Sequence, residues 1–192
     1  MEQVTITAKQ PAPGRLSEVQ DFLNTRDVEE GTDDLGTEAS AVAWLRARGL
    51  RLTRFAEADR RRLVEVREAL RELLQGHHRD GAPAGAEPRL DALFAGVRLR
   101  PRLSTDGATL APQAGGAEGY LGMLSIAIVE ATLAGTWQRL KVCRQSSCRW
   151  AFYDHTKNGR GSWCSMRVCG SRAKARAYRA RQAASRGAGS SG

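Results

Sequence analysis

The sequence predicts an α+β fold, in which a mainly α-helical N-terminal domain with a small β-hairpin precedes a short cysteine-containing module that ends in a basic helix. Three observations support this prediction. Apolar residues recur at helical spacing over most of the first 135 positions, all four cysteines lie between Cys143 and Cys169, and the positive charge is concentrated after position 135. A chain of 192 residues is long enough for one substantial domain with a small additional module.

The first helices are predicted from apolar spacing and from capping residues. Apolar side chains of segment 16–23 fall on one helical face. A second helix is expected to begin at Thr37, as its N-cap, and to stop at Gly49. The clearest helix spans about 55–75, where Leu and Val residues form a stripe; its Arg and Glu residues are expected to form a solvated face.

A connection rich in Gly, Ala and Pro is expected at 76–88. It contains His77 and His78, but adjacent histidines without a second pair of ligands nearby are only a weak indication of a metal site. A short helix is expected to follow at about 88–95.

A hairpin and a long apolar helix complete the predicted N-terminal domain. Apolar residues alternate from Val97 towards Leu110 around the turn sequence TDG, which predicts two short antiparallel strands. Segment 118–135 is almost wholly apolar and is expected to be the central helix of the core, with Met123 as core filler.

The four cysteines form two evenly spaced pairs. Four residues separate Cys143 from Cys148 and Cys164 from Cys169, and fifteen lie between the pairs. Two close pairs joined by a longer segment suit a tetrahedral zinc site, and four thiolates leave no open position for a substrate. We therefore expect one structural Zn²⁺ bound by Cys143, Cys148, Cys164 and Cys169. Two disulfides, four unrelated buried cysteines and an iron–sulfur cluster are the alternatives.

The segment between the two cysteine pairs is expected to form a small hairpin. Trp150 and Phe152 alternate with smaller or polar positions, and HTKNGRGS predicts a turn back to Trp163. Because so small a module buries little surface, the metal and these rings are expected to replace a normal core. Stacking of the rings on nucleic-acid bases is the alternative. His155 is left out of the metal site because four thiolates already complete it.

Charge divides the chain into two unlike parts. Residues 136–192 contain thirteen Lys and Arg residues against the single acid Asp154, a net charge of +12, whereas residues 1–135 carry −3. Such asymmetry favours a polyanionic partner for the C-terminal end.

The positive charge continues into a predicted helix at 170–185, where Ala and Arg dominate. Arg172, Arg176 and Arg179 recur along one helical face, and Lys174 and Arg181 widen the charge. Without acids for pairing along the helix, a polyanion is the natural counterpart; an exposed basic tail without a dedicated partner is the alternative. Residues 185–192 are expected to be a disordered tail.

Several functional classes are not expected. Ser, His and acidic residues do not occur at spacings that suggest a catalytic constellation, so we expect no enzymatic activity. No apolar run approaches the roughly 20 residues that span a membrane. The first residues lack a basic start followed by an apolar run, so we expect a cytoplasmic protein that does not bind membranes.

The C-terminal motifs resemble a known family. The pattern C-x4-C-x-W-x-F-x-D at 143–154, the pattern W-C-S-M-x-x-C-G-x-R at 163–172 and AKARAYRAR at 173–181 strongly resemble the CGNR zinc finger. DFLNT at 21–25, AWLRARGL at 43–50 and VREALRELL at 66–74 look like the ABATE domain, which precedes this finger in bacterial proteins described as stress-induced transcription regulators. The resemblance covers nearly the whole chain.

This resemblance implies a domain organisation. An ABATE-like domain at 1–137 would sense a ligand or pair with another subunit, and a treble-clef-like or ribbon-like zinc finger with its basic helix would occupy 138–184. The resemblance also implies the same four cysteines as zinc ligands. Two departures matter: Ser171 replaces the signature Asn, and Gly161-Ser162 replaces an Arg pair before the Trp, which leaves Arg160 displaced. Reading of a base by a planar amide is lost at Ser171, if the Asn has that role.

The leading functional prediction is a bacterial transcription regulator that binds double-stranded DNA. The expected contact residues are Arg160, Arg172, Lys174, Arg176, Arg179 and Arg181. One alternative is an RNA-binding zinc protein. Another is a sensor whose finger contacts proteins, with an unknown small molecule next to Asn24, unless Asn24 is only a helix C-cap. A homodimer is expected because one short finger seldom supplies enough contact area for specificity.

Overall fold

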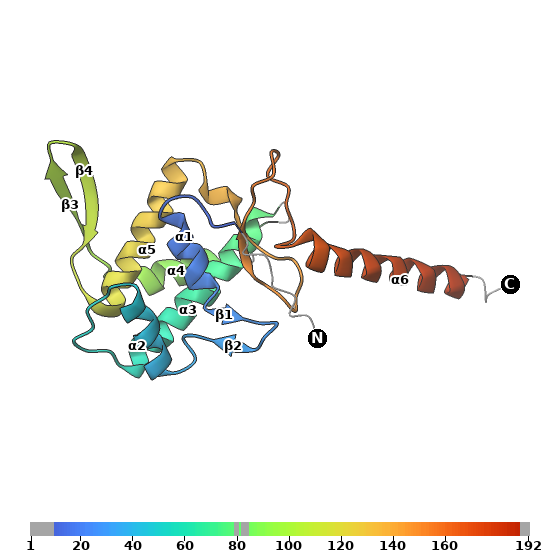
Figure 1. Cartoon of the computed structure of the whole chain (residues 1–192), viewed down its shortest axis with the longest axis horizontal. Helices are drawn as coiled ribbons and strands as arrows, with labels where there is room; N and C mark the ends of the chain where they lie inside the picture. The colour runs from blue at the N-terminus through green and yellow to red at the C-terminus, as the bar shows by residue number, and fades with distance from the viewer. Residues whose placement is uncertain (1–9, 79–80, 82–84, 189–192) are drawn as a thin grey trace.

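A computed structural model describes residues 10–78, 81 and 85–188 of the chain. Its body is a group of helices in which α1, α3 and α5 pack against one another while α2 and α4 pack on α3 (Figure 1). The bounds of these helices are α1 Leu16–Leu23, α2 Glu38–Ala47, α3 Glu57–Leu73, α4 Ala86–Phe94 and α5 Gly116–Leu133. The helical N-terminal part predicted from apolar spacing is confirmed.

Within the described residues, three antiparallel hairpins are added to these helices. Their strands are β1 Arg26–Asp27 with β2 Thr32–Asp33, β3 Leu99–Ser104 with β4 Gly107–Pro112, and β5 Leu140–Val142 with β6 Ala151–Tyr153. The short helices η1 Leu74–His77, η2 Trp137–Arg139 and η3 Met166–Gly170 precede the last helix, α6 Ser171–Ala188. The predicted α+β class, the β3–β4 hairpin and the basic helix are therefore confirmed.

The helix ends show why the local sequence forms these elements. Thr37 Oγ1 accepts a hydrogen bond from the Ser40 amide at 3.1 Å, and Ser40 Oγ accepts one from the Thr37 amide at 3.1 Å. This reciprocal cap starts α2 as predicted. Gly49 has a φ of +77°, a conformation that glycine adopts without strain, and so ends the same helix.

The apolar core runs from the helical body into the cysteine module. The predicted face of α1 is buried, and the rings of Phe22, Trp44 and Tyr120 meet edge to face or tilted. Leu140 and Val142 of β5 and Ala151 of β6 belong to the same buried cluster. The module is therefore packed onto the body by its own hairpin and is not held by a linker alone.

The charged face predicted for α3 is partly wrong. Arg67 and Arg71 are fully buried. The guanidinium of Arg67 donates to both carboxylate oxygens of Asp33, at 2.6 and 2.8 Å, and Arg71 donates to two backbone carbonyls that come from distant segments. A buried charge is tolerated when it is paired and hydrogen-bonded, and the tertiary fold supplies those partners here.

The predicted role of Met123 as core filler is also wrong. Half of the residues of α5 are buried, but Met123 is 39% exposed, and Val129 and Leu133 near the end of the helix are more exposed still. The apolar residues of α5 therefore form two surfaces, one in the core and one exposed to solvent.

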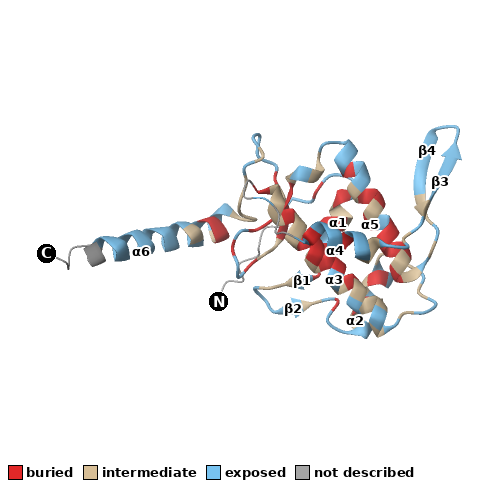
Figure 2. Cartoon of the chain, turned by 180° about the vertical axis from the view of Figure 1, so that it is seen from behind, coloured by how far each residue is buried: buried red, intermediate tan, exposed pale blue. Residues whose placement is uncertain are grey.

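Helix α6 extends away from the body, with its far end opposite the β3–β4 hairpin (Figures 1 and 2). It continues to Ala188, so residues 185–188 are helical where a disordered tail was expected. The Ala and Arg residues that precede them have a high helix propensity, so the helix continues through residues 185–188. Residues 189–192 lie outside the described residues. Within the described part of the chain, no helix is long and apolar enough to cross a membrane.

Candidate metal centre and nucleic-acid interface

The four cysteines converge on one point. Their Sγ atoms all lie within 4.8 Å of one another, with 3.5 Å between Cys148 and Cys164 and 3.7 Å between Cys164 and Cys169. A tetrahedral site with Zn–S bonds of about 2.3 Å has sulfur–sulfur edges of about 3.8 Å. Disulfide bonds measure about 2.05 Å. The geometry therefore fits a four-thiolate metal site and not two disulfides.

Local backbone structure places the first pair of cysteines. Cys143 follows β5 and its amide donates to the Trp150 carbonyl at 2.9 Å. The chain then turns tightly, because the amides of Cys148 and Arg149 both donate to the Gln145 carbonyl and Arg149 has a φ of +51°. This turn returns Cys148 to the side of Cys143.

The second pair is placed at the entrance to the basic helix. Ser165 caps the wide helical turn η3, since its Oγ accepts from the Val168 amide at 3.3 Å. Cys169 lies in that turn, directly before α6. The Ser171 hydroxyl donates to the Met166 carbonyl at 3.3 Å, which confirms that this position keeps a hydrogen-bonding role in the absence of Asn. The metal centre therefore fixes the start of α6.

The thiols need a cation to coexist as thiolates. Burial, followed by the proximity of the other three cysteines, raises the pKa of the Cys169 thiol well above its ordinary value. Trp150, Trp163 and Val168 pack against the cysteines and partly shield them from solvent. A divalent cation bound by four sulfurs supplies the missing positive charge, so the donor set and its surroundings fit Zn²⁺.

A buried ion pair organises the turn between the two cysteine pairs. Asp154 Oδ2 accepts from Lys141 Nζ at 2.9 Å and from the Gly161 amide at 2.6 Å, and its Oδ1 accepts from Thr156. Burial would raise the pKa of Asp154, but these hydrogen bonds outweigh it and lower the pKa to about 2. A Cβ at position 161 would lie 2.7 Å from the Asp154 carboxylate, so glycine is required there. Gly161 thus has a structural role in this turn.

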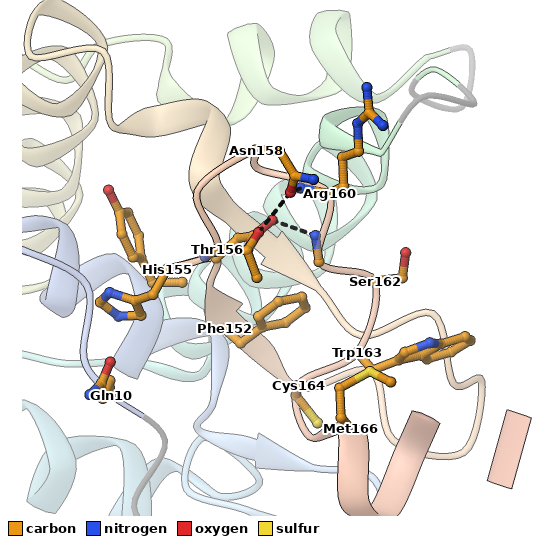
Figure 3. A pocket seen from close by; sticks show the side chains of 13 residues that line it. Gln10, Phe152, His155, Thr156, Asn158, Arg160, Ser162, Trp163, Cys164 and Met166 are labelled. Carbon is orange, nitrogen blue, oxygen red and sulfur yellow. Dashed lines mark hydrogen bonds between the residues drawn. The ribbon is translucent and has the colours of Figure 1, made fainter. Parts of the chain in front are cut away.

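A cavity of about 710 Å³ opens on the same turn. Figure 3 shows Phe152 at its back, with His155 on one side and Trp163 and Met166 on the other. Trp150 and Trp163 pack against the cysteines, as predicted, whereas Phe152 is buried but does not belong to the cysteine cluster. Arg160 lies on the rim and is exposed.

Two side chains of the body hold the module in place. Asn24 caps the C-terminus of α1, and its amide pairs with the backbone of Ala151 in both directions: Nδ2 donates to the carbonyl at 2.9 Å and Oδ1 accepts from the amide at 2.8 Å. Arg71 donates to the carbonyls of Leu23 and Arg149, each at 2.5 Å. Sequence reasoning missed both contacts, since nothing local to α1 or α3 indicates them.

A second cavity, of about 530 Å³, lies beside Asn24. Its wall includes the carboxylates of Asp21, Asp27, Glu29 and Asp34 and the rings of Trp44 and Trp150. Because the two hydrogen bonds to Ala151 fix the orientation of the Asn24 amide, Asn24 serves mainly as a wall of this cavity. The binding of a small molecule there stays a prediction.

His77 and His78 bind the backbone of β5 and do not gather around a metal. His77 Nδ1 lies 2.7 Å from the Leu140 carbonyl, and His78 Nε2 lies 2.7 Å from the Val142 carbonyl. Burial lowers the pKa of both imidazoles. The two neighbouring histidines therefore help to attach β5, and with it the cysteine module, to the N-terminal domain.

The basic residues of α6 divide into two groups. Arg172 Nη1 donates to Glu29 Oε1 at 2.6 Å, and Arg176 donates to the Gln145 side chain. Lys174, Arg179 and Arg181 are exposed and make no hydrogen bond or ion pair with the described part of the chain. Arg167 in η3 is also exposed and was missed, because the helical pattern that found the others begins after Cys169. Two of the three residues of the predicted face, Arg172 and Arg176, thus bind side chains of the protein itself.

Two family models match the chain in sequence order. Residues 17–135 match the ABATE model, described as "Putative stress-induced transcription regulator", and residues 139–182 match the CGNR zinc finger model. The finger match and the four clustered thiols together assign one structural Zn²⁺ to the cysteine centre. A comparison with curated proteins finds no match.

Proposed function

The chain belongs to the ABATE family and carries a CGNR zinc finger after that domain; from this premise we propose that it regulates bacterial transcription in the cytoplasm by binding double-stranded DNA. The proposal gives residues 138–184 the DNA-binding role and residues 1–137 a role in ligand sensing or in pairing with another subunit. The family description is that of a regulator and not of an enzyme.

The observation that carries this proposal is the shape and charge of α6. The helix projects from the body, and it presents Lys174, Arg179 and Arg181 without partners from the described chain (Figure 2). No acid follows Asp154 in the sequence. An α-helix is roughly 10–12 Å across with its side chains, which suits a major groove about 12 Å wide. Exposed cations on such a helix gain affinity by releasing counterions from phosphates.

The zinc centre supports this role from inside the protein. When bound, the ion has a closed shell of four sulfurs, so its contribution is to hold the fold and not to activate a substrate. Because Cys169 lies in η3, which runs directly into α6, the centre sets the direction in which the helix leaves the body. Arg71 and Asn24 then fix the module relative to the N-terminal domain.

The test is binding of the full-length protein to a fluorescently labelled duplex, followed by anisotropy. We expect affinity that falls as salt rises, is lost on zinc chelation, and returns with added Zn²⁺. Cys148→Ser is expected to abolish binding, whereas Ser146→Ala, an exposed position two residues away, is expected to leave it unchanged. An affinity that changes neither with salt concentration nor on zinc chelation would refute the proposal.

A second candidate function is binding of single-stranded nucleic acid, including RNA. The cavity lined by Phe152, His155 and Trp163 favours it, because unpaired bases stack on aromatic rings. Competition between the labelled duplex and unlabelled single-stranded DNA or RNA separates the candidates. If the single strands compete better than the duplex does at equal phosphate concentration, the second candidate replaces the first.

A further inference from the structure

The β3–β4 hairpin has one wholly apolar face. Its register pairs Leu99 with Pro112, Pro101 with Leu110, and Leu103 with Ala108. Directly paired residues and every second residue along a strand share a face, so these six side chains lie together. The other face carries the remaining pairs, which include Arg100 and Arg102. A two-stranded ribbon of this kind is only marginally stable by itself.

The apolar face turns towards α5 at the base of the hairpin and is uncovered at its tip. A Cβ at Gly122 of α5 would lie 2.9 Å from Pro112 Cβ and 3.2 Å from Leu99 Cδ2, so helix and hairpin are in close contact there. Further out, Leu110 is 39% exposed and Leu103 is 82% exposed. Figure 2 shows the hairpin exposed over most of its length, standing away from the body.

Helix α5 carries the matching surface. Gly122, Ile126, Val129 and Leu133 follow one another at helical spacing and therefore form one stripe. Gly122 and Ile126 at the covered end of the stripe are buried, whereas Val129 is 46% and Leu133 is 84% exposed. The stripe on which the hairpin packs thus continues beyond the hairpin as an open apolar surface.

We propose that a second copy of this chain covers both surfaces, with the hairpin of each protomer lying along the exposed half of α5 of the other. Each chain carries both the hairpin and the α5 surface, so a two-fold symmetric dimer contains two identical contacts. The dimensions are compatible: the exposed part of the stripe, from Val129 to Leu133, spans about 6 Å, and the six-residue strand that covers it spans about 20 Å.

Charge also favours a second copy as the partner. Segment 98–104 contains Arg98, Arg100 and Arg102 and no acid, whereas α5 contains Glu118 and Glu130 and no base. The arginines flank the apolar contact, and Glu130 lies within the exposed part of the helix that receives it. Its carboxylate is 3.5 Å from Arg15 of the same chain, in an exposed ion pair of the weak kind that an arginine of a second copy can replace. The hairpin is at the opposite end of the molecule from α6 (Figure 1), so pairing here leaves both basic helices accessible. The inference rests on the part of the proposed function that assigns subunit pairing to residues 1–137. Its failure is distinguishable from a failure of DNA binding, because the contact uses no residue of the zinc finger.

Sedimentation velocity of the zinc-loaded, full-length protein tests the proposal. We expect a dimer for the wild type, and a dissociation constant at least about tenfold higher for Leu103→Glu and for Leu133→Lys, because each places a charge in the apolar contact. Thr109→Glu, on the other face of the hairpin, and Thr132→Lys, outside the apolar stripe, are the matched controls and are expected to remain dimeric. Circular dichroism verifies that each variant is folded.

An equimolar mixture of Leu103→Glu and Leu133→Lys distinguishes hairpin–helix contact from other modes of pairing. In the mixed dimer the introduced Glu faces the introduced Lys, while the second contact is wild type at both positions. We therefore expect the mixture to dimerise although each variant alone does not. A monomeric wild type, a dimer that neither substitution weakens, or a mixture that stays monomeric would each overturn the proposal.

Discussion

Arg172, in the first turn of α6, donates to Glu29 of the loop between β1 and β2 at 2.6 Å. The contact joins the basic helix to the acidic part of the N-terminal domain across 143 positions of sequence. The amides of Glu29 and Glu30 both donate to Asp27 Oδ1, which holds this loop in shape. A residue predicted to bind phosphate is therefore occupied by a carboxylate of its own chain.

Removal of this carboxylate is predicted to strengthen DNA binding. In Glu29→Gln, Arg172 is released for a phosphate, and we expect a gain in duplex affinity of about two- to fivefold at low salt, the range typical of an exposed ion pair. Glu30→Gln removes the same charge without removing the ion pair, and it is the control. Anisotropy titrations of both variants provide the comparison; equal gains would mean that only the overall charge matters.

Asn24→Ala is predicted to loosen the zinc finger from the body. The substitution removes both hydrogen bonds to Ala151. It leaves the Ala151 amide without a partner and its carbonyl with only the long hydrogen bond from Gln20 Nε2, at 3.5 Å, which costs roughly 2 kcal/mol of unfolding free energy. Urea unfolding measures the change. Asn158→Ala, at an exposed turn position, should cost far less, and a similar loss in both variants would show that Asn24 does not attach the module.

The two buried histidines predict a dependence of stability on pH. Burial lowers the pKa of His77, which faces Lys141 and His78, and of His78, which faces Arg144, Lys141 and Asp154. An imidazole with a lowered pKa takes up a proton more readily in the unfolded chain. Its contribution to stability is therefore fully present above about pH 6.5 and is lost as the pH falls below that value.

Replacement of both histidines by Gln should flatten this part of the pH profile. Gln can still donate to the carbonyls of Leu140 and Val142 but does not titrate. Between pH 7.5 and 5.5, we expect the free energy of unfolding to fall further in the wild type than in the double variant. Zinc release at low pH lowers the stability of both proteins and does not account for the difference. His155→Gln, at an exposed ring, is the control; if it flattens the profile as much, the assignment to His77 and His78 is wrong.

The parts of the fold that the sequence predicted are those set by local spacing. The reciprocal cap at Thr37, the hairpin around TDG and the two cysteine pairs each depend on residues a few positions apart. Metal ligation then joins the pairs, because four thiols in one small module have few other uses. These features need no knowledge of the tertiary structure.

The missed features depend on groups that are distant in sequence. The partners of Arg71 are carbonyls at Leu23 and Arg149, so a charge pattern within α3 cannot reveal that this Arg is buried. The sequence around Asn24 likewise indicates only a C-cap for α1, and its contact with Ala151 arises from the tertiary fold. Met123 is exposed because α5 lies at the edge of the body, which the apolar sequence of the helix does not indicate.

The salt dependence of duplex binding tests the central claim, that the unpartnered cations of α6 contact DNA phosphates. The triple variant Lys174→Ala/Arg179→Ala/Arg181→Ala is compared with Arg46→Ala/Arg51→Ala/Arg54→Ala, which removes the same charge from exposed positions in and after α2. Each lost phosphate contact lowers the slope of log K against log salt by about 0.9, so the α6 variant should lose about 2.7. The control should keep nearly the wild-type slope. An unchanged slope in the α6 variant, or an equal loss in both, would contradict the account.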